Sequence, residues 1–307
     1  MIFIIPVTRP FTLLNGEMDG MTRELPKGYS IALEDKRYVI LEVLGKGANI
    51  IAYLATCDHQ GMTSKCILKQ YQGNDIEGFI ASVRMQNEIR QISSAANSIP
   101  PIIHILKTEV GVFVETAYYN GTTLDKCRDL SLLQNMEICL AIARVIRQHH
   151  KAGYLCLDLK PNNIFILKNG EEEVITQIVQ FIDFDAVRKD KTAMPYSYSR
   201  NWASPELRNV YAINRVSAST DIYAIGEIVF YLLFGRHSRD DEHRGFSKYP
   251  FDSCGQGGSI LSKDLIDLFT QLFRGTLRSS TSNRLDIDTV VGLLEDIVAE
   301  CSKNISE

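Results

Sequence analysis

The hydrophobic pattern of the chain changes about a third of the way along. Before that point, short apolar runs separated by turn residues predict β-strands, with one helical stretch from about residue 75 to 93. After it, apolar residues recur mostly every three or four positions, as on one face of a helix. The sequence therefore predicts a sheet with one helix and then a mainly helical part, divided near 116–124. The strands are predicted at 38–44, 50–55, 66–69, 102–106 and 110–116.

The helical part has clear start and stop signals. Ser131 and Gln134 form a capping box, and a stripe follows it that predicts a buried helix face. Residues 221–235 are apolar nearly all round and end at a glycine, which is typical of a central buried helix. The stripe consists of Leu132, Met136, Cys139, Ala143 and Ile146, and further amphipathic helices are predicted at 265–273 and 287–298.

The first 35 residues mix prolines and glycines with polar residues, so we expect a loosely ordered arm or a strand cover there. Met1–Pro6 is apolar but has no basic leader, and we expect no secretion signal. The longest apolar stretch, 228–234, is too short to span a membrane. We divide the chain into an N-terminal extension at 1–35, a first lobe at 36–117 and a second lobe at 118–303.

Composition places the chain among ordinary globular proteins. It has 307 residues, 45% hydrophobic and 23% charged, with a formal net charge of −4. That charge argues against wholesale binding of nucleic acid or an anionic membrane. The seven cysteines are scattered and never in CxxC spacing, so we interpret them as reduced thiols and expect a cytoplasmic protein.

Candidate chemistry is densest at 154–166. There Asp158, Lys160 and Asn163 stand two and three residues apart between apolar runs. A carboxylate can receive a proton from a hydroxyl, an ammonium can hold a phosphate and an amide oxygen can bind Mg²⁺, so the spacing suits phosphoryl transfer. An ordinary polar turn explains the motif alone about equally well.

Other candidates are weaker singly. The glycines of the 45–49 turn could let backbone amides approach phosphates, although a plain hairpin turn is sufficient. Lys69 ends an apolar strand, and Asp183 ends another at 179–185. Glu88 falls on an apolar stripe of the 75–93 helix and could pair with Lys69, but a solvated position at the rim of that face remains open.

Taken in order, these motifs resemble the eukaryotic-type serine/threonine protein kinase family, over roughly 38–298, as a divergent, bacterial-like member. The resemblance implies an α+β bilobal protein kinase fold with an antiparallel sheet and one helix in the first lobe. It also implies ATP and Mg²⁺ as cofactors and a Ser/Thr hydroxyl of a protein as acceptor. Autophosphorylation is a second candidate, and the oligomeric state is left open.

Roles follow from the same resemblance. Asp158 corresponds to the catalytic base, Lys69 to the lysine that holds phosphates, Glu88 to its partner, and Asn163 and Asp183 to the magnesium ligands. Lys160 and Ser199 match positions that point to Ser/Thr substrates. The motif 203–206 resembles the end of the activation segment, so Glu206 would pair with Arg284, and Asp221 would hold the catalytic loop. The nucleotide would contact Leu44, Gly45, Gly47, Ala52, Ile67, Lys69, Val114 and Glu115.

Four positions depart from the family pattern. Ile50 replaces a glycine of the nucleotide loop, Asp185 replaces the glycine after Phe184, and Cys156 and Leu157 replace a histidine and an arginine before the base. Without that arginine, we expect activity that does not depend on phosphorylation of the activation segment. The departures leave a pseudokinase that binds nucleotide or acts as a scaffold as the alternative. A small-molecule phosphotransferase ranks lower, because that class lacks the Pro-Glu motif with its arginine partner.

Overall fold

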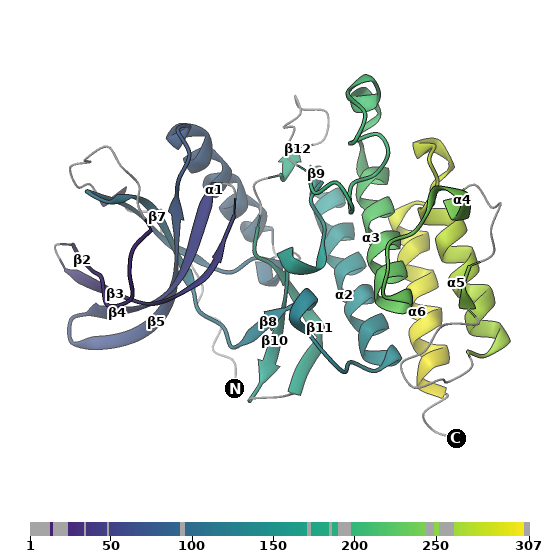
Figure 1. The fold of residues 1–307 in the computed structure, drawn as a ribbon, viewed down its shortest axis with the longest axis horizontal. Helices are drawn as coiled ribbons and strands as arrows, with labels where there is room; N and C mark the ends of the chain where they lie inside the picture. The colour runs from purple at the N-terminus through teal and green to yellow at the C-terminus, as the bar shows by residue number, and fades with distance from the viewer. Residues whose placement is uncertain are drawn as a thin grey trace. The chain divides into compact units, whose positions relative to one another are not determined.

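The computed structural model describes residues 13–14, 24–33, 35–47, 49–92, 96–170, 173–183, 186–189, 198–243, 249–251 and 261–303. The chain divides into two compact units. The first comprises 1–91 and 99–119, and the second comprises 92–98 and 120–307. The bilobal α+β kinase fold expected from the sequence agrees with this division, with a sheet and one helix in the first unit and mostly helices in the second (Figure 1).

The first unit is built on a seven-stranded sheet in the order β1-β6-β7-β5-β4-β3-β2. All its pairs are antiparallel except β1 with β6. The five strands predicted from the sequence are present and mostly longer than predicted. The strands are β1 (Leu13–Leu14), β2 (Ser30–Leu33), β3 (Lys36–Lys46), β4 (Ile50–His59), β5 (Met62–Tyr71), β6 (Ile102–Thr108) and β7 (Gly111–Ala117).

Each face of this sheet has its own core. Helix α1 (Ile76–Gln91) packs Phe79, Ile80 and Val83 against one face, together with Ile105 and Val114. The opposite face, the outer face below, carries a second cluster, and the segment before β3 contributes to it. That cluster includes Leu25, Ile31, Tyr38, Ile40, Tyr53, Leu68 and Phe113.

The prediction that Glu88 lies on the apolar face of α1 is wrong. Glu88 is exposed, as is Ala81 of the expected stripe, whereas Ile89 is fully buried. The large side chains Phe79 and Ile80 set the buried face, because they bury more apolar area than Ala81 does. Exposure of Glu88 does not exclude a pair with Lys69, so that pair stays a prediction.

The second unit is organised around α2 (Leu132–Lys151) and α3 (Ala218–Phe234). The capping box of Ser131 and Gln134 begins α2, and Gly235, with φ 67°, ends α3 in the left-handed conformation. Helix α3 is buried over most of its length, and Gly226 lets it approach α5, because a Cβ there would overlap the side chain of Thr276. The remaining helices are α4 (Asp240–His243), α5 (Lys263–Thr276) and α6 (Ile287–Lys303).

Short strands frame the loop that carries Asp158. A three-stranded sheet in the order β11-β10-β8 and a pair β12-β9 flank it. These strands are β8 (Gly121–Thr123), β9 (Tyr154–Leu155), β10 (Ile164–Asn169), β11 (Glu173–Phe181) and β12 (Arg188–Lys189). Short 3-10 helices lie at η1 (Ala96–Ser98), η2 (Leu124–Lys126), η3 (Pro161–Asn163), η4 (Val210–Arg215) and η6 (Thr281–Asn283).

Among the described residues, no helix is long and apolar enough to cross a membrane. The six cysteines within the described ranges are free thiols, and five of them are buried. Met1–Pro6, Phe184 and Asp185, which are named in the sequence analysis, lie outside the described residues, as does Cys254, the seventh cysteine.

Candidate active site

Asp158, Lys160 and Ser199 form one contact cluster in the second unit. The Nζ of Lys160 lies 2.7 Å from Oδ2 of Asp158 and donates to Oγ of Ser199 at 2.6 Å. The backbone N–H of Ser199 donates to the other Asp158 oxygen at 3.0 Å. Three groups suited to proton transfer and phosphate contact are therefore held within hydrogen-bond distance of one another, although Ser199 is 41 residues from Asp158 in sequence.

The two predicted magnesium ligands lie at the ends of neighbouring strands. Asn163 precedes β10 and Asp183 follows β11, and Ile182 N–H donates to Asn163 O at 3.0 Å. Asn163 donates its amide Nδ2 to the backbone oxygen and to Oδ2 of Asp158. Its amide oxygen is therefore the atom of Asn163 that can bind a cation, and Asp183, which follows the paired strand, is exposed. Such hard oxygen donors fit Mg²⁺.

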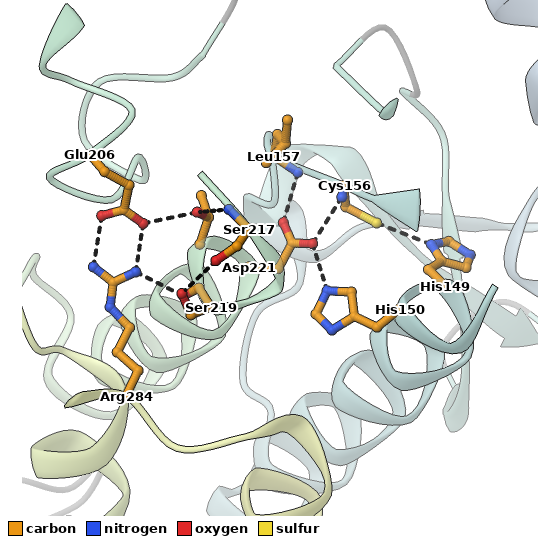
Figure 2. Close-up of polar contacts among 10 residues, drawn as sticks. His149, His150, Cys156, Leu157, Glu206, Ser217, Ser219, Asp221 and Arg284 are labelled. Carbon is orange, nitrogen blue, oxygen red and sulfur yellow. Dashed lines mark hydrogen bonds and ion pairs between the residues drawn. The ribbon is translucent and has the colours of Figure 1, made fainter. Parts of the chain in front are cut away.

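A buried carboxylate fixes the backbone just before Asp158 (Figure 2). Asp221 of α3 is fully buried, and it accepts N–H bonds from Cys156 at 2.9 Å and Leu157 at 2.8 Å. His150 Nε2 of α2 lies 2.9 Å from the same carboxylate. Leu157 has φ 62°, a left-handed conformation that a leucine adopts only when its surroundings hold it there. The predicted role of Asp221 agrees with these contacts.

Cys156 is a core residue, only 5% exposed. Its sulfur lies 3.0 Å from Nδ1 of His149, which is itself completely buried. Burial, and then the nearby charge of Asp221, raises the pKa of the Cys156 thiol well above its ordinary value. Burial lowers the pKa of the His149 imidazole to about 4. The thiol of Cys156 and the imidazole of His149 are therefore both uncharged at physiological pH.

The predicted pair of Glu206 and Arg284 is present. Two N–H···O contacts of 2.6 and 2.8 Å join the side chains, and Thr220 donates to the same carboxylate (Figure 2). Burial alone would raise the pKa of Glu206, but the hydrogen bonds and charge of Arg284 outweigh it, so the pKa lies below its ordinary value. The pair ties the segment before α3 to the chain preceding α6.

A pocket of about 370 Å³ opens beside the cluster of Asp158, Lys160 and Ser199. Pro161 and Asn162 follow Lys160 in its wall, and Trp202 packs edge-on against Tyr231 with ring centroids 5.1 Å apart. The full lining is Asp125, Lys160, Pro161, Asn162, Ser199, Arg200, Asn201, Trp202 and Tyr231.

In the first unit, four of the eight predicted nucleotide residues share one sheet face. Ala52, Lys69 and Val114 stand opposite one another on β4, β5 and β7, and Ile67 lies two residues from Lys69. Directly opposed residues of antiparallel strands point to the same side. Val114 belongs to the core under α1, so this is the face that α1 covers.

Glu115 differs from this group. Its side chain points to the outer face, where Tyr38 donates to it at 2.9 Å and His104 Nδ1 lies 2.7 Å away. Burial alone would raise the pKa of Glu115, but hydrogen bonding to His104 and the charge of Lys36 lower it overall. Only the main chain of Glu115 can face a ligand on the α1 side, so its predicted contact is restricted to backbone atoms.

The glycine-rich hairpin, residues 42–50, leaves the sheet at the β3–β4 turn. Leu44, Gly45 and Gly47 are all exposed, and Gly47 N–H donates to Ile50 O at 2.8 Å. Its β3 side has two irregularities in register, between Ile40 and Glu42 and between Val43 and Gly45. Ala48 at the tip lies outside the described residues.

Sequence reasoning missed His149 and His150. Both stand at the end of a helix, where histidines are common on electrostatic grounds, so nothing local marks them. The partner of His150 lies 71 residues away.

The apolar surroundings of Leu157 were also missed. Leu157 packs with Leu155 and Ala186, and Val216 and Ala218 contact the same cluster.

Comparison with known proteins decides the family. Residues 38–291 match the model of the protein kinase domain. The chain belongs to the protein kinase family. It is 24% identical over 226 residues to serine/threonine-protein kinase PknA of Nostoc sp., which covers 68% of this chain and 39% of that protein. It is 23% identical over 259 residues to serine/threonine-protein kinase F of Synechocystis sp., covering 75% and 50% respectively. The chain thus spans half or less of the length of these relatives.

Proposed function

We propose that this kinase-family chain is an active serine/threonine protein kinase that uses Mg-ATP. The observation that carries the proposal is the contact cluster of Asp158, Lys160 and Ser199, with Asn163 bonded to the same aspartate. The relatives named as serine/threonine-protein kinases support the substrate class.

In the proposed reaction, the acceptor hydroxyl oxygen forms a bond to the γ-phosphorus while the bond to the ADP oxygen breaks. Asp158 receives the proton of the hydroxyl, and Lys160 balances charge on the phosphoryl oxygens. Ser199 holds the Lys160 ammonium and fixes Asp158 through its backbone N–H. The chain's contribution is thus mainly positioning and electrostatics.

Asn163 and Asp183 would hold Mg²⁺, which neutralises phosphate charge when bound. Lys69, with Glu88 as its partner, would hold the phosphates. The nucleotide would lie against Leu44, Ala52, Ile67, Val114 and the main chain of Glu115, under Gly45 and Gly47.

We further propose that activity does not require phosphorylation of the activation segment. Leu157 stands where a phosphate-binding arginine would be needed, and it packs into an apolar cluster with Leu155 and Ala186. The pairing of Arg188 with Leu155 also anchors the segment after Asp183 to the catalytic loop. These contacts are independent of any phosphate. Phosphatase treatment should therefore leave the rate of transfer unchanged, and loss of transfer after treatment would refute this part.

The test of the main proposal is transfer of radiolabelled phosphate from Mg-ATP to the chain itself and to a generic basic protein. Asp158→Asn and Asp183→Asn are compared with Asp296→Asn, which changes an exposed aspartate on α6. We expect transfer by the parent and by Asp296→Asn, and a loss of about 10²–10⁴-fold in the other two.

A result without transfer would favour the pseudokinase alternative. If the parent still bound nucleotide, as seen by a thermal shift with Mg-ATP, the fold would act as a binding module. Equal transfer by Asp158→Asn and the parent would instead contradict the assignment of the base.

A further inference from the structure

The segment that leads into β3 runs back along that strand as far as the glycine-rich hairpin. Residues 24–33, called the N-terminal arm below, begin with Glu24 near the hairpin and end with β2. Strand β2 pairs with the far half of β3, with Ile31 opposite Tyr38, and Gly28 N–H donates to Ile40 O at 2.8 Å. Glu24 forms an ion pair with Lys46, the last residue of β3.

Tyr53 joins the arm to the interior of the sheet. Its hydroxyl accepts the Leu25 N–H at 3.0 Å and donates to Oε1 of Gln70 at 2.9 Å. Gln70, next to Lys69, donates in turn to Val110 O at 2.8 Å. Tyr53 and Gln70 are completely buried and Leu25 is 4% exposed, so each of these polar groups depends on its neighbour. Burial raises the pKa of Tyr53, which keeps the hydroxyl protonated and able to donate.

The hairpin has little packing of its own on the β3 side. Residues 42–47 are all exposed, and the register irregularities leave Leu41 and Leu44 outside the regular ladder. Tyr53 lies on β4 opposite Val43, one residue from the pair of Ala52 and Gly45. Glu24 therefore contacts the hairpin on its irregular side, and Leu25 contacts Tyr53, which stands opposite Val43 of the hairpin.

We propose that the N-terminal arm braces the glycine-rich hairpin, and that Tyr53 is the positioning residue through which the brace acts. The arm sets the height and orientation of Gly45 and Gly47 without touching a ligand itself. This inference rests on the proposed function, because it assumes that the hairpin covers the phosphates of ATP. Loosening the brace weakens nucleotide binding and leaves the transfer step on Asp158 intact.

The experiment compares Tyr53→Phe and Leu25→Ala with Cys66→Ala, a control in the same outer core. Equilibrium binding of Mg-ATP, KM for ATP, kcat and unfolding temperature are measured for each. We expect Tyr53→Phe to raise Kd and KM for ATP about five-fold, the size expected for a broken buried hydrogen bond, with kcat at saturation unchanged. Cys66→Ala should lower the unfolding temperature without changing Kd.

The double variant tests whether the two residues act through one brace. Leu25→Ala with Tyr53→Phe should weaken binding by about as much as the stronger single variant, because coupled residues are not additive. Glu24→Ala, at an exposed position, gives a variant that keeps the core intact and should raise Kd by a smaller factor. Unchanged Kd in all arm variants, or an equal rise in Cys66→Ala, would overturn the inference. Failure of the parent to bind Mg-ATP would overturn the proposed function, and this inference with it.

Discussion

The catalytic loop of the second unit and the glycine-rich hairpin of the first unit are held in opposite ways. The loop rests on a fully buried carboxylate, Asp221, which accepts two backbone N–H bonds and a histidine contact. The hairpin tip is exposed, its β3 side is irregular in register, and an arm outside it contacts that side through the ion pair of Glu24 with Lys46. The catalytic loop is thus held by a buried side chain of the second unit, and the hairpin is held on one side by a segment at the sheet edge.

This difference matches what each element is proposed to do. A proton acceptor has to be in place before the substrate arrives, because misplacement by about 1 Å can cost 10²-fold in rate. A cover over the nucleotide has to admit ATP and release ADP, so it gains from being movable. The following four predictions probe the contrast, in order of decreasing effect.

The largest effect is expected on stability, from Arg284. Arg284→Met leaves Glu206 buried without its cation, and the free energy of unfolding should fall by about 3–5 kcal/mol in urea titrations. The double variant with Glu206→Gln should recover part of this loss, because no uncompensated charge remains. A double variant as unstable as the single one would show that packing of the arginine, rather than charge, is what matters.

The second prediction concerns the anchor of the catalytic loop. Asp221→Asn replaces one acceptor by a donor that faces the N–H groups of Cys156 and Leu157. We expect kcat to fall about 100-fold, consistent with the loss of one or two buried hydrogen bonds. Kd for Mg-ATP should stay unchanged. Circular dichroism measures the fraction of the variant that is folded. If kcat fell only in proportion to that fraction, the result would contradict a positioning role.

The third prediction is a pH dependence shared by the two units. Glu206 and Glu115 both have a pKa below the ordinary value of 4.5, so each adds stability that is present above pH 4.5. That stability is lost as pH falls below 4.5 through the lower folded-state values. Glu206→Gln and Glu115→Gln should each flatten the acid limb of a plot of unfolding free energy against pH. An unchanged limb in either variant would contradict the assignment for that residue.

The smallest effect is expected at the hairpin itself. Leu44 is 43% exposed, so Leu44→Ala should change the unfolding free energy by no more than about 0.5 kcal/mol. If Leu44 contacts the nucleotide, KM for ATP should nevertheless rise roughly three-fold, from lost apolar contact. Val43→Ala, at the neighbouring exposed position, is the matched control and should leave KM unchanged. Equal effects of the two variants would count against the contact.

The strong periodic elements of this fold could be predicted from the sequence. The capping box of α2 and the glycine that ends α3 are local signals, and both occur in the structure. Strand β2 was not predicted as such, because it is only four residues long and comes shortly after Pro26 and Gly28, which indicate a turn. The buried face of α1 was misjudged because adjacent apolar residues at 79 and 80 fit more than one helical stripe.

The candidate site was predictable to the extent that it is local. Asp158, Lys160 and Asn163 lie within six residues, and their residue types already indicate the chemistry. Ser199 was found only through the family resemblance, since 41 residues separate it from Asp158. Tyr53 and His150 gave no signal, because an apolar strand and a helix end accommodate these residues for ordinary reasons. Their partners are set by the tertiary fold.

The buried thiols have a practical consequence for labelling. Thiol reagents attack the thiolate, and burial raises the pKa of Cys301 to about 11 and that of Cys139 to about 12. Maleimide dyes should therefore react slowly with the buried cysteines of the folded chain. With Cys127 and Cys254 replaced by serine, a single cysteine introduced at exposed Glu42 could carry a fluorophore selectively. Such a probe would report movement of the hairpin directly, in real time, as nucleotide is added.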